Sequence, residues 1–204
     1  MSLLRRRVMI GQNKYKLPAG YQKVKYIEST GAQFIDHRRV FGSDYQFNFR
    51  FEFTKVKGYY NIFDHVGDPK GKNMLWVDQY GQFESAAGSF KYGHVQLKLT
   101  DIKVVFKDNV QHVYIDENLS CKAPCTNNVT ISFLRRVTKN ERSFVGKVFG
   151  YNAIENGEKV IDIVPVLKEG NPGLYDVVTG TFFQNIGSGK FGYETLDGTY
   201  VAPV

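Results

Sequence analysis

Aromatic and polar residues alternate without a break in one stretch of the chain, Tyr45-Gln46-Phe47-Asn48-Phe49-Arg50-Phe51-Glu52-Phe53-Thr54. Successive side chains of a β-strand point to opposite faces, so this stretch predicts a strand with rings on one face and polar groups on the other. A helix would distribute the rings around its circumference. Each ring buries about 150–250 Å² in a core, so the row needs a second layer to cover it. The stretch therefore predicts a central strand of a two-sheet sandwich.

Short alternating stretches recur along the chain, with turn residues between them. The expected strands lie at residues 26–36 (two short strands around Gly31), 59–63, 74–80, 95–99, 102–106, 113–116, 129–133, 144–151 and 159–166. Two turns are typical of hairpins, Lys107-Asp108-Asn109 and Glu155-Asn156-Gly157-Glu158, because Asn-Gly suits a tight loop. No stretch has the period of an amphipathic helix. We predict an all-β fold, an antiparallel two-sheet β-sandwich.

Composition supports one β domain with short tails. The chain has 204 residues, 20 of them glycine, and 15% are aromatic, a balance that favours strands and turns over helices. Its net charge is +7, but the basic residues are spread along the chain, so we interpret them as solvated surface and do not expect nucleic-acid binding. No run of eighteen apolar residues predicts a membrane span. The basic start lacks the apolar core of a signal peptide, so we do not expect export.

Residues 1–16 have no clear periodicity and are predicted to be an N-terminal basic arm, followed by the sandwich domain over residues 17–204. The arm contains an arginine triplet flanked by apolar residues, Leu3, Leu4, Arg5, Arg6, Arg7, Val8 and Ile10. These side chains suit anchoring to another protein or to a sister subunit, through a groove or an exposed sheet edge. An ordinary disordered terminus is the alternative.

Three segments resemble a known family. The opening segment is Leu17-Pro18-Ala19-Gly20-Tyr21-Gln22-Lys23-Val24-Lys25-Tyr26-Ile27-Glu28-Ser29-Thr30-Gly31-Ala32-Gln33-Phe34-Ile35-Asp36, and the late segments are residues 146–152 with 162–166, and 173–185. Together they resemble bacteriophage and prophage structural proteins with a laminin-G-like, concanavalin A-like jelly-roll domain. The resemblance implies a non-enzymatic virion component of capsid, fibre or tail. Such a protein is made in the host cytoplasm, is present in multiple copies and contacts other virion proteins.

The sequence gives no metal or cofactor site. Cys121 and Cys125 have no second pair of ligands at zinc-site spacing, so two free thiols in a turn are expected. The loop Asp64-His65-Val66-Gly67-Asp68, with Asp78 nearby, offers too few carboxylates for calcium and has lysines close by. One glycine-rich segment lacks the spacing of a phosphate loop and is predicted to be a turn; it is Gly187-Ser188-Gly189-Lys190-Phe191-Gly192.

Catalysis is not expected either. Glycoside hydrolases use two carboxylates flanking the scissile bond, and the strand pattern Glu-x-Asp-x-x-Glu of jelly-roll hydrolases is absent. The acids on predicted strands are single and interpreted as facing solvent; they are Glu52, Asp78, Glu84 and Asp162. We therefore predict no catalytic residues and a protein that is not an enzyme.

Sugar binding is the alternative function. If Leu75 and Val77 face the core, then Trp76, Asp78 and Tyr80 share the outer face of one strand, where rings beside a carboxylate suit sugar stacking or a protein interface. These three residues are the predicted ligand-binding set, for glycans of a host cell surface. Trp76 as an ordinary core residue is an equally weighted alternative.

Overall fold

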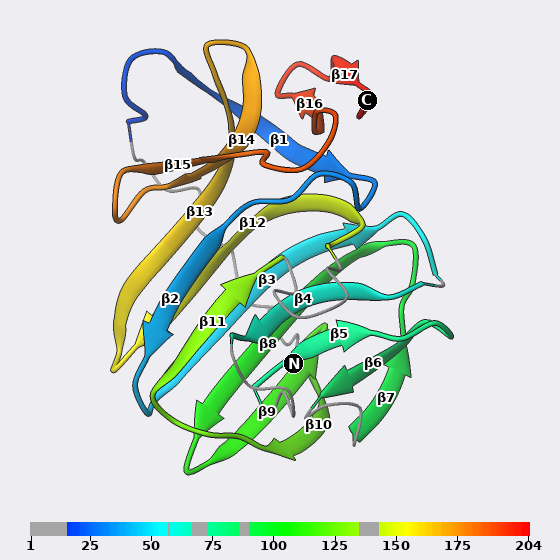
Figure 1. Ribbon diagram of the computed structural model, residues 1–204, viewed down its shortest axis with the longest axis vertical. Helices are drawn as coiled ribbons and strands as arrows, with labels where there is room; N and C mark the ends of the chain where they lie inside the picture. Colours follow the sequence, from blue (N-terminus) through cyan, green and yellow to red (C-terminus); the bar gives the residue numbers. More distant parts are fainter. Residues whose placement is uncertain (1–15, 57, 67–72, 86–89, 135–142) are drawn as a thin grey trace, which may run out of the picture.

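The computed structural model describes residues 16–56, 58–66, 73–85, 90–134 and 143–204. Within these ranges the chain forms seventeen β-strands and no α-helix (Figure 1). The described part of the chain accordingly contains no helix long and apolar enough to cross a membrane.

The strands form two antiparallel sheets. The larger has the order β10 (Asn118–Pro124), β9 (Val110–Ile115), β8 (Leu99–Lys107), β3 (Tyr45–Phe53), β12 (Gly146–Glu155), β1 (Tyr21–Ser29), β13 (Glu158–Lys168), β14 (Asn171–Asp176) and β15 (Thr181–Gln184), and β1 also pairs with β16 (Gly192–Thr195), which pairs with β17 (Tyr200–Val201). The smaller lies across its face in the order β2 (His37–Phe41), β11 (Val129–Phe133), β4 (Tyr60–His65), β5 (Leu75–Val77), β6 (Gln82–Ser85) and β7 (Phe90–His94) (Figure 1). The predicted antiparallel two-sheet β-sandwich is confirmed.

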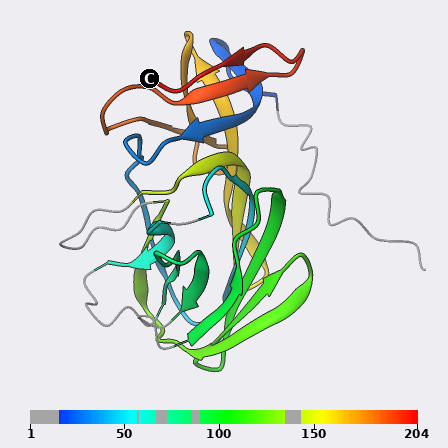
Figure 2. The same cartoon turned by 90° about the vertical axis from the view of Figure 1, so that its right-hand side faces the viewer.

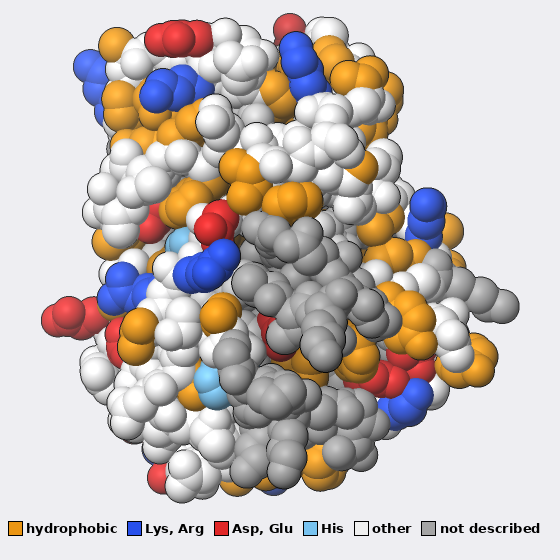
Figure 3. Space-filling model, in the orientation of Figure 1, with side chains coloured by type: hydrophobic (Ala, Val, Ile, Leu, Met, Phe, Trp, Pro, Cys, Tyr) orange, Lys and Arg blue, Asp and Glu red, His pale blue; other side chains and the backbone are white. Residues whose placement is uncertain are grey.

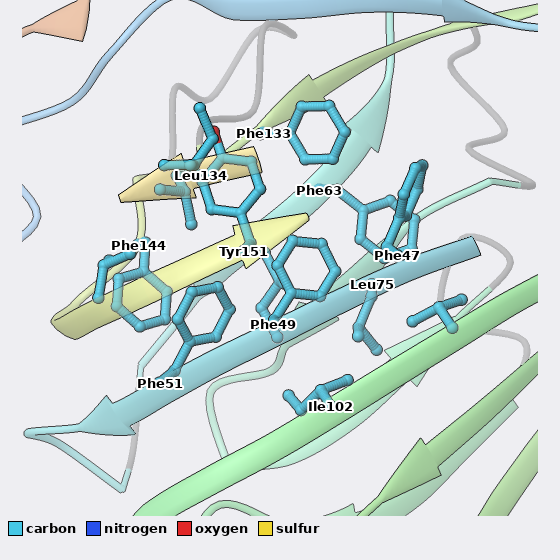
Figure 4. Close-up of a cluster of buried hydrophobic side chains, with 14 of the residues drawn as sticks. Phe47, Phe49, Phe51, Phe63, Leu75, Ile102, Phe133, Leu134, Phe144 and Tyr151 are labelled. Atoms are coloured by element: carbon cyan, nitrogen blue, oxygen red, sulfur yellow. The ribbon is translucent and has the colours of Figure 1, made fainter. Parts of the chain in front are cut away.

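Strand β3 supplies the centre of the core, as its alternating sequence predicts. All five of its rings are buried, each at most 3% exposed, and they meet rings of the smaller sheet (Figure 4). The ring centre of Phe47 lies 5.2 Å from that of Phe63 on β4 and 5.1 Å from that of Phe133 on β11. Edge-to-face contacts at this distance add to the free energy of burying the rings.

The opposite face of β3 is polar and half-exposed. Asn48 donates a hydrogen bond of 2.8 Å to Asn152 on β12, and Gln46 donates one of 2.9 Å to Asn48. Lys147 on β12 pairs with Glu52 at 2.7 Å. The amide and charged groups therefore stabilise the strand pairing on the side away from the core.

Both predicted hairpin turns are present. Asp108 and Asn109, between β8 and β9, have φ of 53° and 59°. Asn156 and Gly157, between β12 and β13, have φ of 51° and 84°. Two successive positive φ values define the turn whose twist matches antiparallel strands, which is why Asn, Asp and Gly occupy these positions.

Three sequence-based expectations are wrong in detail. Residues 26–36 were expected to form two short strands, but β1 ends at Ser29 and β2 begins at His37. Leu97 is 59% exposed and precedes β8, so the expected strand over residues 95–99 does not form. Asp78, Glu84 and Asp162 are at most 4% exposed, whereas they were expected to face solvent. Nearby cations and backbone N–H groups replace the water that these carboxylates lose.

The end of the described chain packs beside its beginning. The β16–β17 hairpin extends the larger sheet beyond β1, at the end of the molecule opposite the β9–β10 hairpin (Figure 2). The chain bends over residues 187–189, where the Ser188 N–H donates to the Ala32 carbonyl at 3.1 Å. The predicted arm, residues 1–16, falls outside the described ranges except for Lys16.

Candidate functional site

A pocket of about 360 Å³ opens between the two sheets at the β2 edge of the sandwich. We call it the seam pocket; its lining residues are Asp36, His37, Arg38, Arg39, Ile161, Asp176, Thr179, Thr181 and Phe183. The smaller sheet contributes the start of β2, and the larger contributes β13 and the β14–β15 hairpin. On this part of the surface Figure 3 shows a histidine beside acidic and basic side chains. The volume lies within the range of about 300–1,000 Å³ that is typical of small-molecule sites.

The pocket exists because β2 is an edge strand. Its described ladder is with β11, and its other side meets no strand of the smaller sheet. Alternation along β2 buries His37 and Phe41 toward the interior and exposes the intervening Arg38. Near this edge the side chains facing the larger sheet are therefore polar as well as apolar.

The β14–β15 hairpin forms the opposite wall around a buried carboxylate. Asp176, 1% exposed, accepts hydrogen bonds at Oδ1 from the N–H groups of Asp162 (3.0 Å) and Val178 (3.1 Å). Its Oδ2 accepts one from the Thr179 hydroxyl at 2.9 Å. The turn closes through Gly180, whose φ of +73° suits glycine. These bonds fix the turn of the hairpin and join it to β13.

His37 links the pocket to the core. Its Nδ1 lies 2.6 Å from the hydroxyl of Tyr151, and its ring stacks on Phe183 with centres 4.3 Å apart. Burial lowers the pKa of His37 to about 4, although the Asp176 carboxylate opposes this shift. The imidazole is therefore neutral at pH 7.

The position of the imidazole proton follows from hydrogen-bond accounting. Tyr151 is fully buried, and among the described residues its hydroxyl has one partner, the Nδ1 of His37. If Nδ1 carried the proton, the Tyr151 hydroxyl hydrogen would have no acceptor, a cost of about 1–3 kcal/mol. We therefore assign the Tyr151 hydroxyl as donor to Nδ1 and place the proton on Nε2. Nε2 has no hydrogen-bond partner among the described residues, so its N–H is available to the pocket.

The two arginines differ in how they are bound. Arg38 donates from Nε and Nη2 to the carboxylate of Asp36, at 2.6 and 3.2 Å. Arg39 makes no hydrogen bond to a described residue; its Nη2 lies 3.7 Å from the carboxylate of Glu155, and its Nε is buried without an acceptor. Glu155 instead accepts the Gly42 N–H at 2.7 Å. The guanidinium of Arg39 therefore has donors available for a ligand.

The three ligand-binding residues predicted from the sequence do not lie on one strand. Leu75 and Val77 are fully buried as expected, and Trp76, on β5, points away from the core and is partly exposed. Its ring centre lies 5.9 Å from that of Tyr59. Strand β5 ends at Val77, so Asp78 and Tyr80 lie in the following turn, and Tyr80 is 61% exposed. The assumption of one continuous strand over residues 74–80 was the error.

Asp78 has a structural role in that turn. It accepts the N–H groups of Tyr80 (2.8 Å) and Gln82 (2.9 Å), and Lys91 lies 2.9 Å from it and 2.6 Å from Glu84. Burial alone would raise the pKa of Asp78, but these hydrogen bonds outweigh burial and hold the pKa below its usual value. The carboxylate is committed to the turn rather than presented to a ligand.

The two cysteines, the acidic loop and the arm complete the predicted sites. Cys121 and Cys125 are free; Cys121 lies within β10 and Cys125 follows it, rather than both lying in a turn. Within the described ranges no three His, Cys, Asp or Glu side chains gather as metal ligands, and Asp68 of the considered loop lies outside those ranges. The anchoring residues of the arm also lie outside them; they are Leu3, Leu4, Arg5, Arg6, Arg7, Val8 and Ile10.

Sequence reasoning missed the seam pocket because its walls are far apart in the chain. Residues 36–39 and 176–183 carry no motif that links them. The one signal was local: Asp176, three residues before Thr179-Gly180, is typical of a turn in which a carboxylate accepts backbone N–H groups.

Comparison with solved structures supports the β-sandwich fold. No family model matches the chain, and no curated protein matches it either. A solved structure from Bacteroides ovatus, whose suggested function is carbohydrate binding, is similar with a TM-score of 0.62 at 12% identity, over 89% of this chain. The chain spans 62% of the length of that protein. A Trypanosoma rangeli sialidase in complex with 2,3-difluorosialic acid matches 63% of the chain and 26% of its own with a TM-score of 0.44 at 12% identity, which is too low for an argument.

Proposed function

We propose that the protein is a non-catalytic carbohydrate-binding module and that the seam pocket holds its ligand. One observation carries the proposal: the pocket brings N–H donors, a carboxylate, hydroxyl groups and an aromatic ring together around a volume of about 360 Å³. Sugars present hydroxyl groups that both donate and accept, beside C–H surfaces that pack on rings. The shared fold with a protein whose suggested function is carbohydrate binding supports the proposal.

The state of the carboxylates favours binding over hydrolysis. Asp36 is paired with Arg38, and Asp176 accepts three hydrogen bonds. Glycoside hydrolysis requires one carboxyl group that donates a proton and a second that acts as base or nucleophile. Both pocket carboxylates are instead engaged by donors of this chain, so neither is positioned as a free acid or base.

Glycan binding is testable with a matched pair of substitutions. The wild-type protein should retain glycans on an array, and Arg39→Gln should reduce that retention about tenfold or more. Arg50→Gln is the control, because Arg50 is also a half-exposed arginine 3.7 Å from a carboxylate, that of Asp101, on the outer face of the larger sheet. Equal retention by the two variants, or no retention by the wild-type protein, would overturn the proposal.

A virion role stays a prediction from the resemblance. A glycan-binding module is compatible with a particle that attaches to a host surface, so the two proposals do not compete. Mass spectrometry of purified virions decides the virion role by the presence or absence of the chain. Its outcome leaves glycan binding unaffected.

A further inference from the structure

The charges that line the seam pocket balance one another. Asp36 and Arg38 form an ion pair with a shortest contact of 2.6 Å, and the charge of Arg39 faces Glu155 at 3.7 Å. The lining holds two carboxylates, of Asp36 and Asp176, and two guanidinium groups, of Arg38 and Arg39, so an entering ion of either sign meets like charge as well as opposite charge. Like charges close together in a partly desolvated site are costly. The pocket therefore favours an uncharged ligand.

Two donors in the pocket have no acceptor among the described residues. Nε2–H of His37 has no partner among the described residues, and Arg39 makes no hydrogen bond to them. The imidazole donor is fixed in direction, since the ring is held between Tyr151 and Phe183. A carbonyl oxygen, with two lone pairs in one plane, accepts from two such donors at once.

The pocket also offers acceptors and an apolar surface. The Asp176 carboxylate is almost fully buried and accepts from Thr179, while the hydroxyl of Thr181 is exposed nearby, at 2.9 Å from that of Thr179, and can accept from a ligand. The partly buried ring of Phe183 supplies carbon surface in the same lining. A matching substituent would have a carbonyl oxygen, an N–H and a small apolar group.

We propose that the seam pocket selects an N-acetylated amino sugar, recognised through its acetamido group. This inference rests on the proposed carbohydrate binding and narrows it. The acetamido carbonyl accepts from His37 and Arg39, the amide N–H donates toward the exposed hydroxyl of Thr181, and the methyl group packs on Phe183. A hydroxyl in place of the acetamido group would leave the donors unmatched and the apolar surface uncovered.

The test uses four probes that share one sugar ring: N-acetylglucosamine, glucose, glucosamine and glucuronate. Isothermal titration calorimetry with the full chain should show N-acetylglucosamine binding at least about tenfold more tightly than the other three. His37→Phe should reduce the affinity for N-acetylglucosamine to that for glucose, whereas His112→Phe, on β9 of the larger sheet, should leave it unchanged. Arg39→Gln provides a second variant that does not disturb the buried Tyr151 contact.

The outcomes separate this inference from the proposed function. Equal affinities for glucose and N-acetylglucosamine, or tighter binding of glucuronate, would overturn the selectivity and leave carbohydrate binding standing. Array retention of glycans that contain no N-acetyl group would do the same. If no probe binds and the array retains nothing, both proposals are wrong.

Discussion

The same two sheets face each other at the centre of the sandwich and at its β2 edge, with opposite chemistry. At the centre, the ring of Phe47 lies 5.1–5.3 Å from the rings of Phe63, Phe106 and Phe133, and no polar side chain is needed (Figure 4). At the edge, His37, Arg39 and Asp176 surround an open pocket. Burial of rings closes the interior without directional demands. The edge depends on individual hydrogen bonds, and the donors left over are what a ligand can use.

Tyr151 connects the two regions. Its ring packs among the core aromatics, 5.3 Å from that of Phe133, and its hydroxyl meets His37. The stability of the core and the chemistry of the pocket are therefore coupled through one side chain. Substitutions at the centre should therefore lower the stability of the fold more than substitutions at the surface.

Removing a central ring should have the largest effect. Phe47→Ala deletes a fully buried ring that contacts both sheets, so we expect a loss of about 3–5 kcal/mol in the free energy of unfolding. Chemical denaturation monitored by circular dichroism measures it. A loss below about 1 kcal/mol would contradict the central position of β3.

Acid should weaken the fold through His37. The folded state keeps the imidazole neutral down to its pKa of about 4, whereas the unfolded chain binds the proton near the ordinary value of 6.5. The contribution is complete above about pH 6.5 and decreases as the pH falls toward 4, by up to about 3 kcal/mol. Unfolding between pH 7 and 4 should show this slope, and the double variant His37→Phe, Tyr151→Phe should lack that part of it. An identical slope in both proteins would contradict the buried neutral histidine.

A double-mutant cycle tests the contact between the core and the pocket. His37→Phe leaves the buried Tyr151 hydroxyl without an acceptor, and Tyr151→Phe leaves Nδ1 of His37 without a donor. Each should cost about 1–3 kcal/mol, and the double variant should cost less than their sum because both polar groups are gone. Additive losses would show that the 2.6 Å contact does not stabilise the fold.

The smallest effect is expected at Tyr80. This side chain is 61% exposed in a turn, so Tyr80→Ala should change the free energy of unfolding by less than about 0.5 kcal/mol. Glycan retention on the array should be unchanged if the seam pocket is the binding site. Lost retention, especially together with Trp76→Ala, would instead locate binding on the surface that the sequence predicted.

Features made by residues close together in the chain could be predicted from the sequence, whereas features made by distant segments could not. The alternation in β3 and the Asn156-Gly157 turn are local, so strand, core face and hairpin could be predicted correctly. The burial of Asp78 depended on Lys91, which an adjacent ladder brings to it, and no local pattern shows such pairing. The seam pocket joins β2 to a hairpin more than a hundred residues later, so its donors and carboxylate come together only in the folded chain.

The protonation and tautomer of His37 test the proposed seam pocket most directly. Long-range proton–nitrogen NMR on the full chain at pH 7 should show His37 neutral, with hydrogen on Nε2 and a lone pair on Nδ1, and adding N-acetylglucosamine should shift the Nε2 resonance. A hydrogen on Nδ1 or a charged ring would contradict the assigned state of His37, and an Nε2 resonance that does not respond to the sugar would contradict recognition of N-acetylglucosamine in the seam pocket.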